Sequence, residues 1–273
     1  MLAAERRAHI LSELEREGTV RVSDLVGELG VSDMTVRRDL DLLQREGVLE
    51  KVHGGAVARA EPSTAEPGFE AKSARQLAEK EAIAARAASL VQPGSAIAVS
   101  AGTTTHIMAK HLAGIPGLTV VTNSVWVADV LHRSMQSQQS QQSSMSVLLT
   151  GGLRTPSDAL VGPIAISALR SLHLDAVFMG VHGMDPHAGF STPNLLEAET
   201  NRAMVAAGRR LVVVADSTKW GVVGLSSMAA LTDAAVVVTD RGLPAHAART
   251  LAEHVGELIE VRPESSSALP LAP

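Results

Sequence analysis

Two adjacent arginines, Arg37 and Arg38, stand in the stretch SDMTVRRDL at residues 32–40. If this stretch is helical, Ser32 is a small polar residue suited to cap it, and the arginines follow after little more than one turn. Guanidinium groups donate paired hydrogen bonds to guanine edges and to phosphate oxygens. Arginines near the start of an exposed helix therefore indicate contact with a nucleic-acid duplex.

A second candidate site is the stretch VSAGTTTHIMAKHL at residues 99–112. Gly102 and the three residues after it, Thr103, Thr104 and Thr105, separate a strand-like run from a helix-like run. Backbone N–H groups at a helix start lack partners, a glycine permits close approach, and threonine hydroxyls add donors. The loop therefore predicts an anion site suited to phosphate, although threonines that only cap the helix are the alternative.

Two lysines are candidate cations for the same anion. Lys80 lies on the predicted helix before this strand, and Lys219 follows another strand in the stretch ADSTK. A lysine can donate charge-assisted hydrogen bonds to phosphate oxygens. Exposure to solvent is the alternative for each, because it is the commoner fate of lysines.

The elements that must position the arginines are predicted within residues 1–57. Helical spacing ends at Gly18, Ser23 can cap a short second helix, and a third helix stops at Gly47. Two short strands surround a Gly-Gly turn. The order is that of a winged helix-turn-helix, with helices at 4–17, 23–29 and 33–46, a strand at 19–22 and the wing at 48–57.

The third helix has an apolar face and a polar face. Its apolar spacing turns Val36, Leu40 and Leu43 inward. The predicted DNA-contacting residues of this helix and of the wing are Ser32, Met34, Thr35, Arg37, Arg38, Arg45, Lys51 and His53. A solvated face with surface ion pairs is the alternative, because residues 1–60 carry nine Lys and Arg against eleven Asp and Glu.

After a predicted linker at residues 58–74, helix-like and strand-like runs alternate through a second domain at 75–262. The strand-like runs are short and rich in valine, which is typical of strands buried on both faces. This pattern predicts an α/β fold with an open, mostly parallel sheet, whose ligands bind at the carboxyl ends of the strands. The predicted strands are 96–100, 118–122, 146–150, 175–179, 211–215, 234–238 and 257–261, with helices at 76–90, 105–112, 194–207 and 244–254.

Composition restricts the classes of function. The 273 residues carry a net charge of −5, so any DNA contact must be local. No apolar run approaches the ~20 residues of a membrane span, and the first ten residues lack a signal-peptide pattern, so the cytoplasm is the expected compartment. The absence of cysteine excludes disulfides and thiolate chemistry. A Gln/Ser-rich surface loop at 134–145 and a disordered tail at 263–273 are also expected.

The run from Arg6 to Val57, centred on LVGELGVSDMTVRRDLDLLQREGVLEKVHGGAV, resembles the DeoR-type winged helix-turn-helix of bacterial sugar-catabolism regulators. The likeness continues in EKEAIAARAASLV, SAGTTT, VVTNS, LLTGG, VFMGVHGM, PNLLEAET, VVVADSTKWG and VVVTD, which are similar to motifs of that family's effector-sensing domain. It covers roughly nine-tenths of the chain.

The segment KEAIAARAASLVQPGSAIAVSAGTTT also resembles the phosphate-binding start of pentose-phosphate isomerases and aminosugar-phosphate deaminases. That resemblance implies that Lys80 and the three threonines hold a phosphate. It further implies that the sugar end of the cleft is lined by Asn123, Gly151, Gly152, Asn194 and Glu197.

The sequence departs from these families at two points. Ser100 stands where the DeoR-type family usually has an acid, so the hydrogen bonds to an effector are expected to differ. The isomerases carry their acid/base pair on an Asp-Gly-Ala-Asp/Glu type of loop, and this sequence has no such loop. The prediction is therefore a non-enzyme.

No cofactor or metal site is predicted. His106 and His111 are five positions apart and lack an acidic companion on their helix, and His182 stands alone in GVHGM. Methionines are scattered and aromatic residues are scarce, so neither class marks a cofactor site.

The sequence predicts a transcriptional regulator, a repressor of a carbohydrate catabolic or uptake operon, whose second domain binds a phosphorylated sugar. Its partners would be double-stranded operator DNA and further copies of itself, as a homodimer or homotetramer, because one helix reads only a short half-site. A phosphosugar isomerase or deaminase with an appended DNA-binding module is the alternative from another class. A second domain that serves only for oligomerisation is a third possibility.

Overall fold

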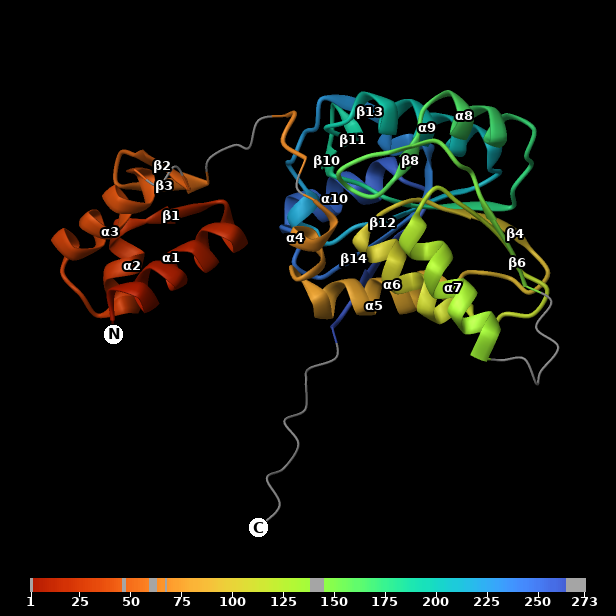
Figure 1. Cartoon of the computed structure of the whole chain (residues 1–273). Coiled ribbons are helices and arrows are strands. Elements are labelled where there is room, and N and C mark those ends of the chain that lie inside the picture. The colour runs from red at the N-terminus through yellow and green to blue at the C-terminus, as the bar shows by residue number, and fades with distance from the viewer. Residues whose placement is uncertain (1, 46–47, 59–62, 67, 138–144, 264–273) are drawn as a thin grey trace, which may run out of the picture. The chain divides into compact units, whose positions relative to one another are not determined.

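The computed structural model describes residues 2–45, 48–58, 63–66, 68–137 and 145–263 (Figure 1). The chain divides into two compact units, Met1–Pro62 and Ser63–Pro273. The helices are α1 (Ala3–Glu17), α2 (Val22–Leu29), α3 (Asp33–Arg45), α4 (Phe69–Ser73), α5 (Leu77–Ala88), α6 (Thr103–Leu112), α7 (Val125–Ser137), α8 (Pro163–Arg170), α9 (Leu195–Ala207) and α10 (Ala245–His254), with 3-10 turns η1 (Ser217–Lys219) and η2 (Leu231–Asp233). The strands are β1 (Thr19–Arg21), β2 (Leu49–Val52), β3 (Gly55–Ala58), β4 (Ala96–Val99), β5 (Thr119–Thr122), β6 (Ser146–Leu149), β7 (Leu153–Arg154), β8 (Leu160–Val161), β9 (Ala176–Gly180), β10 (Gly183–Asp185), β11 (Gly189–Thr192), β12 (Leu211–Val214), β13 (Ser226–Ala229), β14 (Ala234–Asp240) and β15 (Leu258–Val261).

The first unit is the predicted winged helix-turn-helix. Three helices pack on a small antiparallel sheet of order β1-β3-β2, and β2 and β3 form the wing. Gly18 and Gly30 end α1 and α2 in the left-handed region, at φ 70° and 63°, which a glycine adopts without strain. The expected cap at Ser23 is wrong, because α2 begins one residue earlier and the Ser23 hydroxyl bonds to Asp24 instead. The expected stop at Gly47 lies outside the described residues.

The second unit contains the predicted parallel sheet, with seven strands in the order β15-β14-β12-β9-β4-β5-β6. All six strand pairs of this sheet are parallel. The chain builds outward from β4 through β5 to β6, then returns beside β4 with β9 and continues in the other direction. The reversal between β4 and β9 is a topological switch point, where ligands of such sheets bind at the carboxyl ends of the strands.

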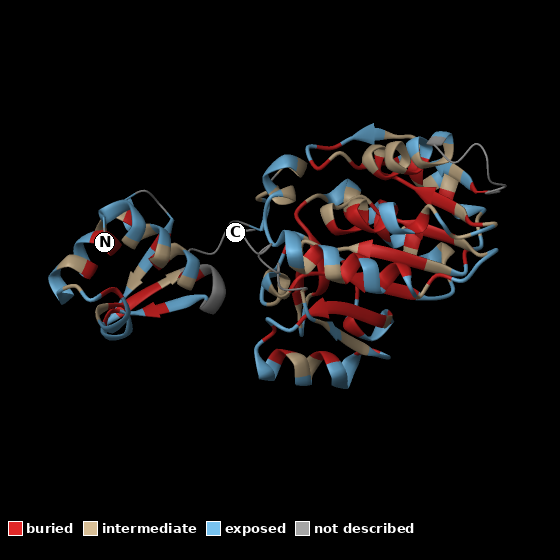
Figure 2. Ribbon diagram, turned by 90° about the horizontal axis from the view of Figure 1, so that it is seen from below, coloured by how far each residue is buried: buried red, intermediate tan, exposed pale blue. Residues whose placement is uncertain are grey.

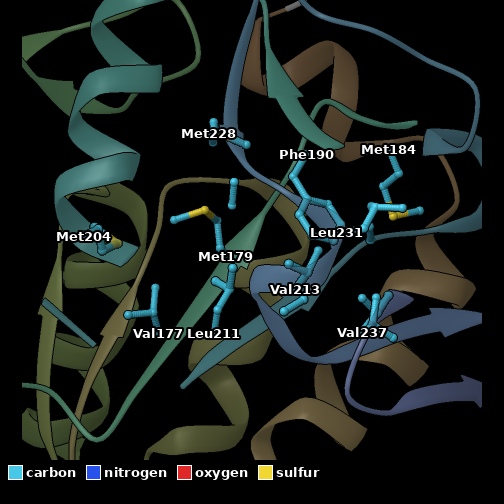
Figure 3. Packing of buried hydrophobic residues seen from close by; sticks show 14 of the residues in the cluster. Val177, Met179, Met184, Phe190, Met204, Leu211, Val213, Met228, Leu231 and Val237 are labelled. Atoms are coloured by element: carbon cyan, nitrogen blue, oxygen red, sulfur yellow. The ribbon is translucent and has the colours of Figure 1, made fainter. Parts of the chain in front are cut away.

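Alternate residues of the five inner strands, β14, β12, β9, β4 and β5, enter two different cores, one on each face of the sheet. On one face α5, α6 and α7 cover side chains such as Phe178 and Val212. On the other face Val177, Met179 and Val213 pack with α8, α9, α10 and the small sheet β10-β11-β13 (Figure 3). Burial on both faces explains why the inner strands read as apolar runs, and buried residues concentrate along the strands in Figure 2, whereas the edge strands β6 and β15 are partly exposed.

Two segments contain more regular structure than the sequence predicted. Residues 63–66 and 68–74, part of the predicted linker at 58–74, belong to the second unit and include the helix α4. Helix α7 continues to Ser137, into the predicted loop at 134–145. Most of that loop, at 138–144, and the predicted tail from residue 264 lie outside the described residues. In the part of the chain that the structure describes, every helix is too short or too polar to cross a bilayer.

Candidate functional site

Helix α3 presents a polar face because its apolar face is fully used within the first unit. Val36, Leu40 and Leu43 are buried and pack against α1, α2 and the sheet. Met34 is 60% exposed, and Arg37, Arg38 and Arg45 are exposed. Ser32 caps the helix as predicted, because its Oγ accepts a hydrogen bond from the Thr35 amide at 3.3 Å.

The two arginines of the doublet differ in their partners. Arg37 Nε donates to Asp33 Oδ1 at 2.5 Å, one turn earlier, and this hydrogen bond holds the pKa of Asp33 below its usual value. Arg38 makes no hydrogen bond or ion pair with any residue that the structure describes. The Arg37–Asp33 pair is a surface ion pair of the kind that the alternative expects, whereas Arg38 forms none with the described residues.

Those two aspartates have other partners. Asp39 is buried and accepts from Arg6 Nε at 2.8 Å. Asp41 accepts from Lys51 of the wing at 2.5 Å, and this hydrogen bond lowers the pKa of Asp41. Arg45 donates to the backbone oxygen of Asp41 at 3.2 Å. Arg38 is thus an exposed cation without an ion pair to the described residues, and His53 at the wing turn is also exposed.

A pocket opens in the second unit at the switch point between β4 and β9. Its wall includes residues at or beyond the carboxyl ends of three strands: Ala101 and Gly102 after β4, Gly180 to His182 at β9, and Val214 to Asp216 at β12. The position is the one that the sheet topology predicts for a ligand. Of the predicted ligand-binding residues, the pocket brings together Lys80, Gly102, Thr103, Thr104, Glu197 and Lys219.

One end of the pocket is formed by the start of α6. The helix begins at Thr103, two residues earlier than predicted. The backbone amide of His106 donates the first helical hydrogen bond, to the Gly102 carbonyl at 3.0 Å. The amides of the first turn therefore precede the hydrogen-bond ladder and can bind an anion. Thr103 and Thr104 line the pocket, whereas Thr105 is buried and donates to the Gly102 carbonyl.

Three lysines surround the same end. Lys80 is 3% exposed, and burial lowers its pKa to about 8 against the opposing effect of Asp216. Its Nζ donates to the backbone oxygen of Lys72 at 2.6 Å. Burial and the charge of Lys219 also lower the pKa of Lys72, while Glu197 and Glu66 act against this. Lys72 and Lys219 both line the pocket, so an anion there would meet three cationic side chains.

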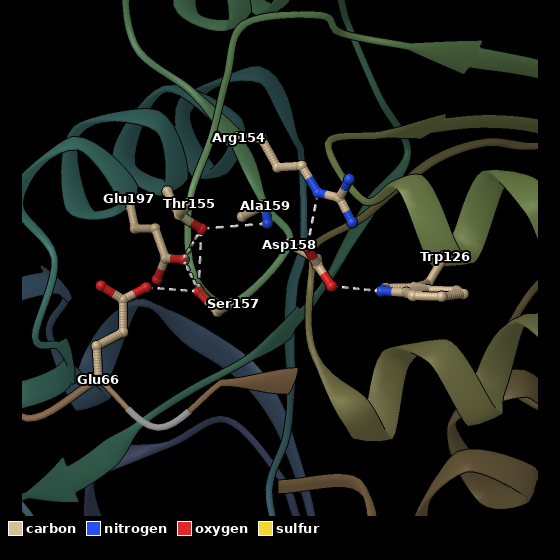
Figure 4. Close-up of polar contacts among 8 residues, drawn as sticks. All are labelled: Glu66, Trp126, Arg154, Thr155, Ser157, Asp158, Ala159 and Glu197. Carbon is tan, nitrogen blue, oxygen red and sulfur yellow. Dashed lines mark hydrogen bonds and ion pairs between the residues drawn. The ribbon is translucent and has the colours of Figure 1, made fainter. Parts of the chain in front are cut away.

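The pocket also contains carboxylates, around Glu197. Thr155 and Thr192 donate to its two oxygens at 3.0 and 2.9 Å, and Ser157 donates as well (Figure 4). Glu66 approaches the same serine, with its Oε1 2.8 Å from Ser157 Oγ. The pocket therefore combines cationic and acidic side chains, since Glu197 and Glu66 act on Lys72 and Asp216 acts on Lys80.

Four predicted ligand residues are absent from the pocket lining, and three of them form hydrogen bonds with residues of the wall. Ser100 accepts from the Gly180 amide at 3.0 Å, and Asn123 accepts from the Ala101 amide at 2.9 Å. Gly152 has φ 123°, and a Cβ there would lie 2.5 Å from the Val161 oxygen. Asn194 caps α9 and donates to Glu66 at 3.0 Å. Gly151, in the same turn as Gly152, is also absent from the pocket lining.

Sequence reasoning missed several lining residues, among them Glu66, Phe69, Lys72, Ser157 and Thr192. The first three fall in the predicted linker, and no periodicity or spacing in that stretch marks them. The described residues bring together no group of three His, Asp or Glu side chains that could hold a metal ion. His111 pairs with Glu81 at 2.7 Å, and the His106 ring lies against Phe69 and Trp126.

Both units match known families. The DeoR-like helix-turn-helix domain matches residues 6–61, and the DeoR C terminal sensor domain matches residues 75–241. "Uncharacterized HTH-type transcriptional regulator YgbI" of Escherichia coli K12 is 36% identical and covers 97% of this chain and 100% of its own. HTH-type transcriptional regulator GolR of Listeria innocua is 33% identical over 88% and 91% of the two chains. The lactose phosphotransferase system repressor of Staphylococcus aureus is 33% identical over 86% and 91%. The two family matches and the relatives agree along the chain, which belongs to the DeoR family of transcriptional regulators.

Proposed function

We propose that this regulator binds double-stranded operator DNA through α3 and its wing, represses a carbohydrate catabolic or uptake operon, and is controlled by a phosphorylated sugar bound in the second unit. The observation that carries the proposal is the pocket at the switch point. It combines the first turn of α6 and three lysines with the carboxylates of Glu66, Glu197 and Asp216. One S. aureus relative, by its name, represses a lactose phosphotransferase system, which supports a sugar-linked role.

The arrangement of α3 supports operator binding. A recognition helix places small or polar residues at its first turn against base edges and uses guanidinium groups for guanine or phosphate. Thr35 lies in that turn, and Arg38 is exposed without a described partner. The first unit is not basic, so its affinity for DNA would depend on these few contacts rather than on a general positive field.

The chemistry of the pocket favours a phosphorylated polyhydroxy compound over a simple anion. Phosphate oxygens suit the lysines and the amides at the start of α6. The carboxylates of Glu66 and Glu197 would repel a plain anion but accept hydrogen bonds from hydroxyl groups. A sugar phosphate presents both kinds of group on one molecule.

We further propose that the regulator acts as a homodimer or homotetramer. A single recognition helix reads a short half-site, and two copies related by a two-fold axis read a palindrome. A coupling of ~1 to 3 kcal/mol between effector and operator would change DNA affinity by about 5- to 150-fold.

Two measurements on the full chain test this function. Duplexes selected from a random library identify the DNA that it binds, and a thermal-shift screen uses ribose 5-phosphate, hexose 6-phosphates, the unphosphorylated sugars and inorganic phosphate. We expect a selected palindromic duplex and saturable stabilisation by at least one sugar phosphate, beyond the effect of inorganic phosphate. Conversion of that sugar phosphate to a product would support the isomerase or deaminase alternative. Stabilisation by none of the probes, with intact DNA binding, would instead favour a second unit that serves only for oligomerisation.

A further inference from the structure

Glu66 enters the pocket from a segment that directly follows the DNA-binding unit. It precedes α4, and the structure describes residues 63–66 and 68 between Ala58 and that helix. Ser157, 91 residues later in the chain, and Asn194, 128 residues later, are its hydrogen-bond partners. The Glu66 carboxylate and Glu197 approach the same serine from two sides (Figure 4).

The hydroxyl of Ser157 has one hydrogen but faces two carboxylate oxygens. Both Glu66 Oε1, at 2.8 Å, and Glu197 Oε1 lie within hydrogen-bond distance of Ser157 Oγ. A carboxylate accepts hydrogen bonds and donates none, so Ser157 can satisfy only one of the two oxygens at a time. The contact of Ser157 with Glu197 is the shorter one.

The remaining donors favour Glu197 as the residue that Ser157 satisfies. Glu197 already accepts from Thr155 and Thr192, so its position in the wall is fixed by three hydroxyls. Glu66 Oε2 accepts from the Asn194 side chain at 3.0 Å, but its Oε1 has only the shared serine hydrogen. Glu66 lines the pocket. Its Oε1 is a strong hydrogen-bond acceptor, and its described neighbours satisfy that acceptor only in part.

We propose that Glu66 reads the effector by accepting a hydrogen bond from a hydroxyl or amino group of the ligand, while the ligand's phosphate occupies the end formed by Lys80 and the start of α6. This inference rests on the proposed phosphosugar site and adds to it a specificity-determining residue. Because the reading side chain lies near the start of the second unit, a few residues after the DNA-binding unit ends, we expect its contact with the ligand to contribute to the coupling between pocket and DNA-binding unit.

The segment has other contacts that do not involve Glu66. The Ser63 carbonyl accepts from the Leu225 amide at 2.8 Å, and the Lys72 carbonyl accepts from Lys80. Phe69 stacks on Trp126 with ring centroids 5.5 Å apart. These contacts keep the segment on the second unit when Glu66 is changed, so a substitution there tests ligand reading rather than folding.

The test compares Glu66→Gln with Glu70→Gln, a matched control on the exposed side of α4. A glutamine amide can donate to Ser157 Oγ, which completes the network without a ligand. We expect Glu66→Gln to lower affinity for the best sugar phosphate of the screen about tenfold and to leave affinity for inorganic phosphate unchanged, as judged by calorimetric titration. Its melting temperature without ligand should not fall. Glu70→Gln should match the wild-type protein in each measurement.

A second readout follows the DNA. In the wild-type protein and in Glu70→Gln, the sugar phosphate should change affinity for the selected duplex, whereas in Glu66→Gln this change should shrink to less than twofold. If Glu66→Gln keeps the wild-type preference for the sugar phosphate over inorganic phosphate, the inference is wrong and the proposed function stands. If no sugar phosphate binds the wild-type protein, the proposed function and the inference both fail.

Discussion

Arg6 Nε lies 2.8 Å from Asp39 Oδ2, and this ion pair joins α1 to α3 inside the first unit. The two side chains are only 13% and 10% exposed. Because Asp39 follows Arg38 directly in the sequence, its inward orientation removes the nearest carboxylate in the chain from the exposed face of α3. Successive side chains on a helix do not face each other, so the inward Asp39 leaves Arg38 exposed and unpaired with it.

Breaking this pair should destabilise the first unit. In Asp39→Asn the partly buried Arg6 loses its ion pair with Asp39, at a cost of about 1 to 3 kcal/mol in the free energy of unfolding. Both tryptophans, Trp126 and Trp220, lie in the second unit, so far-UV circular dichroism should show an earlier urea transition that tryptophan fluorescence does not. The exposed pair of Asp33 with Arg37 provides the control, because Asp33→Asn should leave both transitions nearly unchanged. Equal effects of the two variants would contradict the structural role of Asp39.

Arg38→Ala should weaken DNA binding without a change in stability. The side chain has no described partner, so its loss removes no contact within the fold, whereas a lost base contact costs roughly 1 to 3 kcal/mol of binding free energy. Gel-shift titration with the selected duplex should show about 5- to 150-fold weaker binding. Arg133→Ala on α7 removes the same charge from the second unit and should have little effect. Wild-type affinity in Arg38→Ala would exclude α3 as the recognition helix in the proposed orientation.

The winged helix-turn-helix and the strands of the parallel sheet could be predicted from the sequence because they have local signals, whereas α4, α8 and the small sheet of β10, β11 and β13 were not predicted. Apolar spacing identified the inner face of α3, apolar runs identified six strands of the parallel sheet, and the mixed stretch ELIEV indicated the seventh. The order of helices and strands then restricted the second unit to an open parallel sheet. The pocket at the carboxyl ends of the strands follows from that topology rather than from any single motif.

The division of roles among polar residues in the pocket could not be predicted, because it depends on contacts between distant parts of the chain. Ser100 and Asn123 stand where ligand contacts were expected, yet their hydrogen bonds hold the neighbouring backbone of Gly180 and Ala101. Glu66 lies in a stretch of Ala, Pro, Ser and Glu without periodicity. Its place in the pocket is set by residues 91 and 128 positions away, which no local pattern can indicate.

Lys80 should make effector binding depend on pH above neutrality. Its pKa, lowered by burial to about 8, lies below that of an ordinary lysine, so its folded form loses the proton first. A lysine in the unfolded chain has a pKa of about 10.4. Between pH 8 and this value the unfolded chain binds more protons than the folded chain. The free energy of unfolding of the ligand-free protein should therefore rise with pH in this range. A bound phosphate favours the charged lysine, so its affinity should fall above pH 8, by up to about tenfold per pH unit.

Two variants separate Lys80 from the other cations near it, Lys72, Arg75 and Lys219. Lys80→Met should lose most of the affinity for the sugar phosphate at pH 7 and should show no further decline between pH 8 and 9. Lys219→Met retains the buried lysine, so its weaker binding should still decline in that range. Titration calorimetry at several pH values measures the affinity of each variant for the sugar phosphate. A pH dependence in Lys80→Met equal to that of the wild-type protein would show that another group titrates.

Phe69 should fix α4 to the second unit through its ring contacts. Its ring stacks on Trp126 at 5.5 Å and an interplanar angle of 18°, and it meets the His106 ring edge-on at the same distance. Trp126 is itself held by a hydrogen bond from its Nε1 to Asp158 at 2.7 Å (Figure 4). Phe69→Ala removes the stacked ring and should lower stability of the second unit by about 1 to 3 kcal/mol, because an aromatic pair contributes ~0.5 to 1.5 kcal/mol beyond the buried area. Thermal unfolding followed by tryptophan fluorescence measures this loss, and Phe69→Leu, which keeps an apolar side chain, should recover part of it.

Phe69→Ala should also weaken sugar phosphate binding, because Glu66 and Lys72 lie on either side of Phe69 in the sequence. Unchanged binding would show that α4 does not position these two pocket residues.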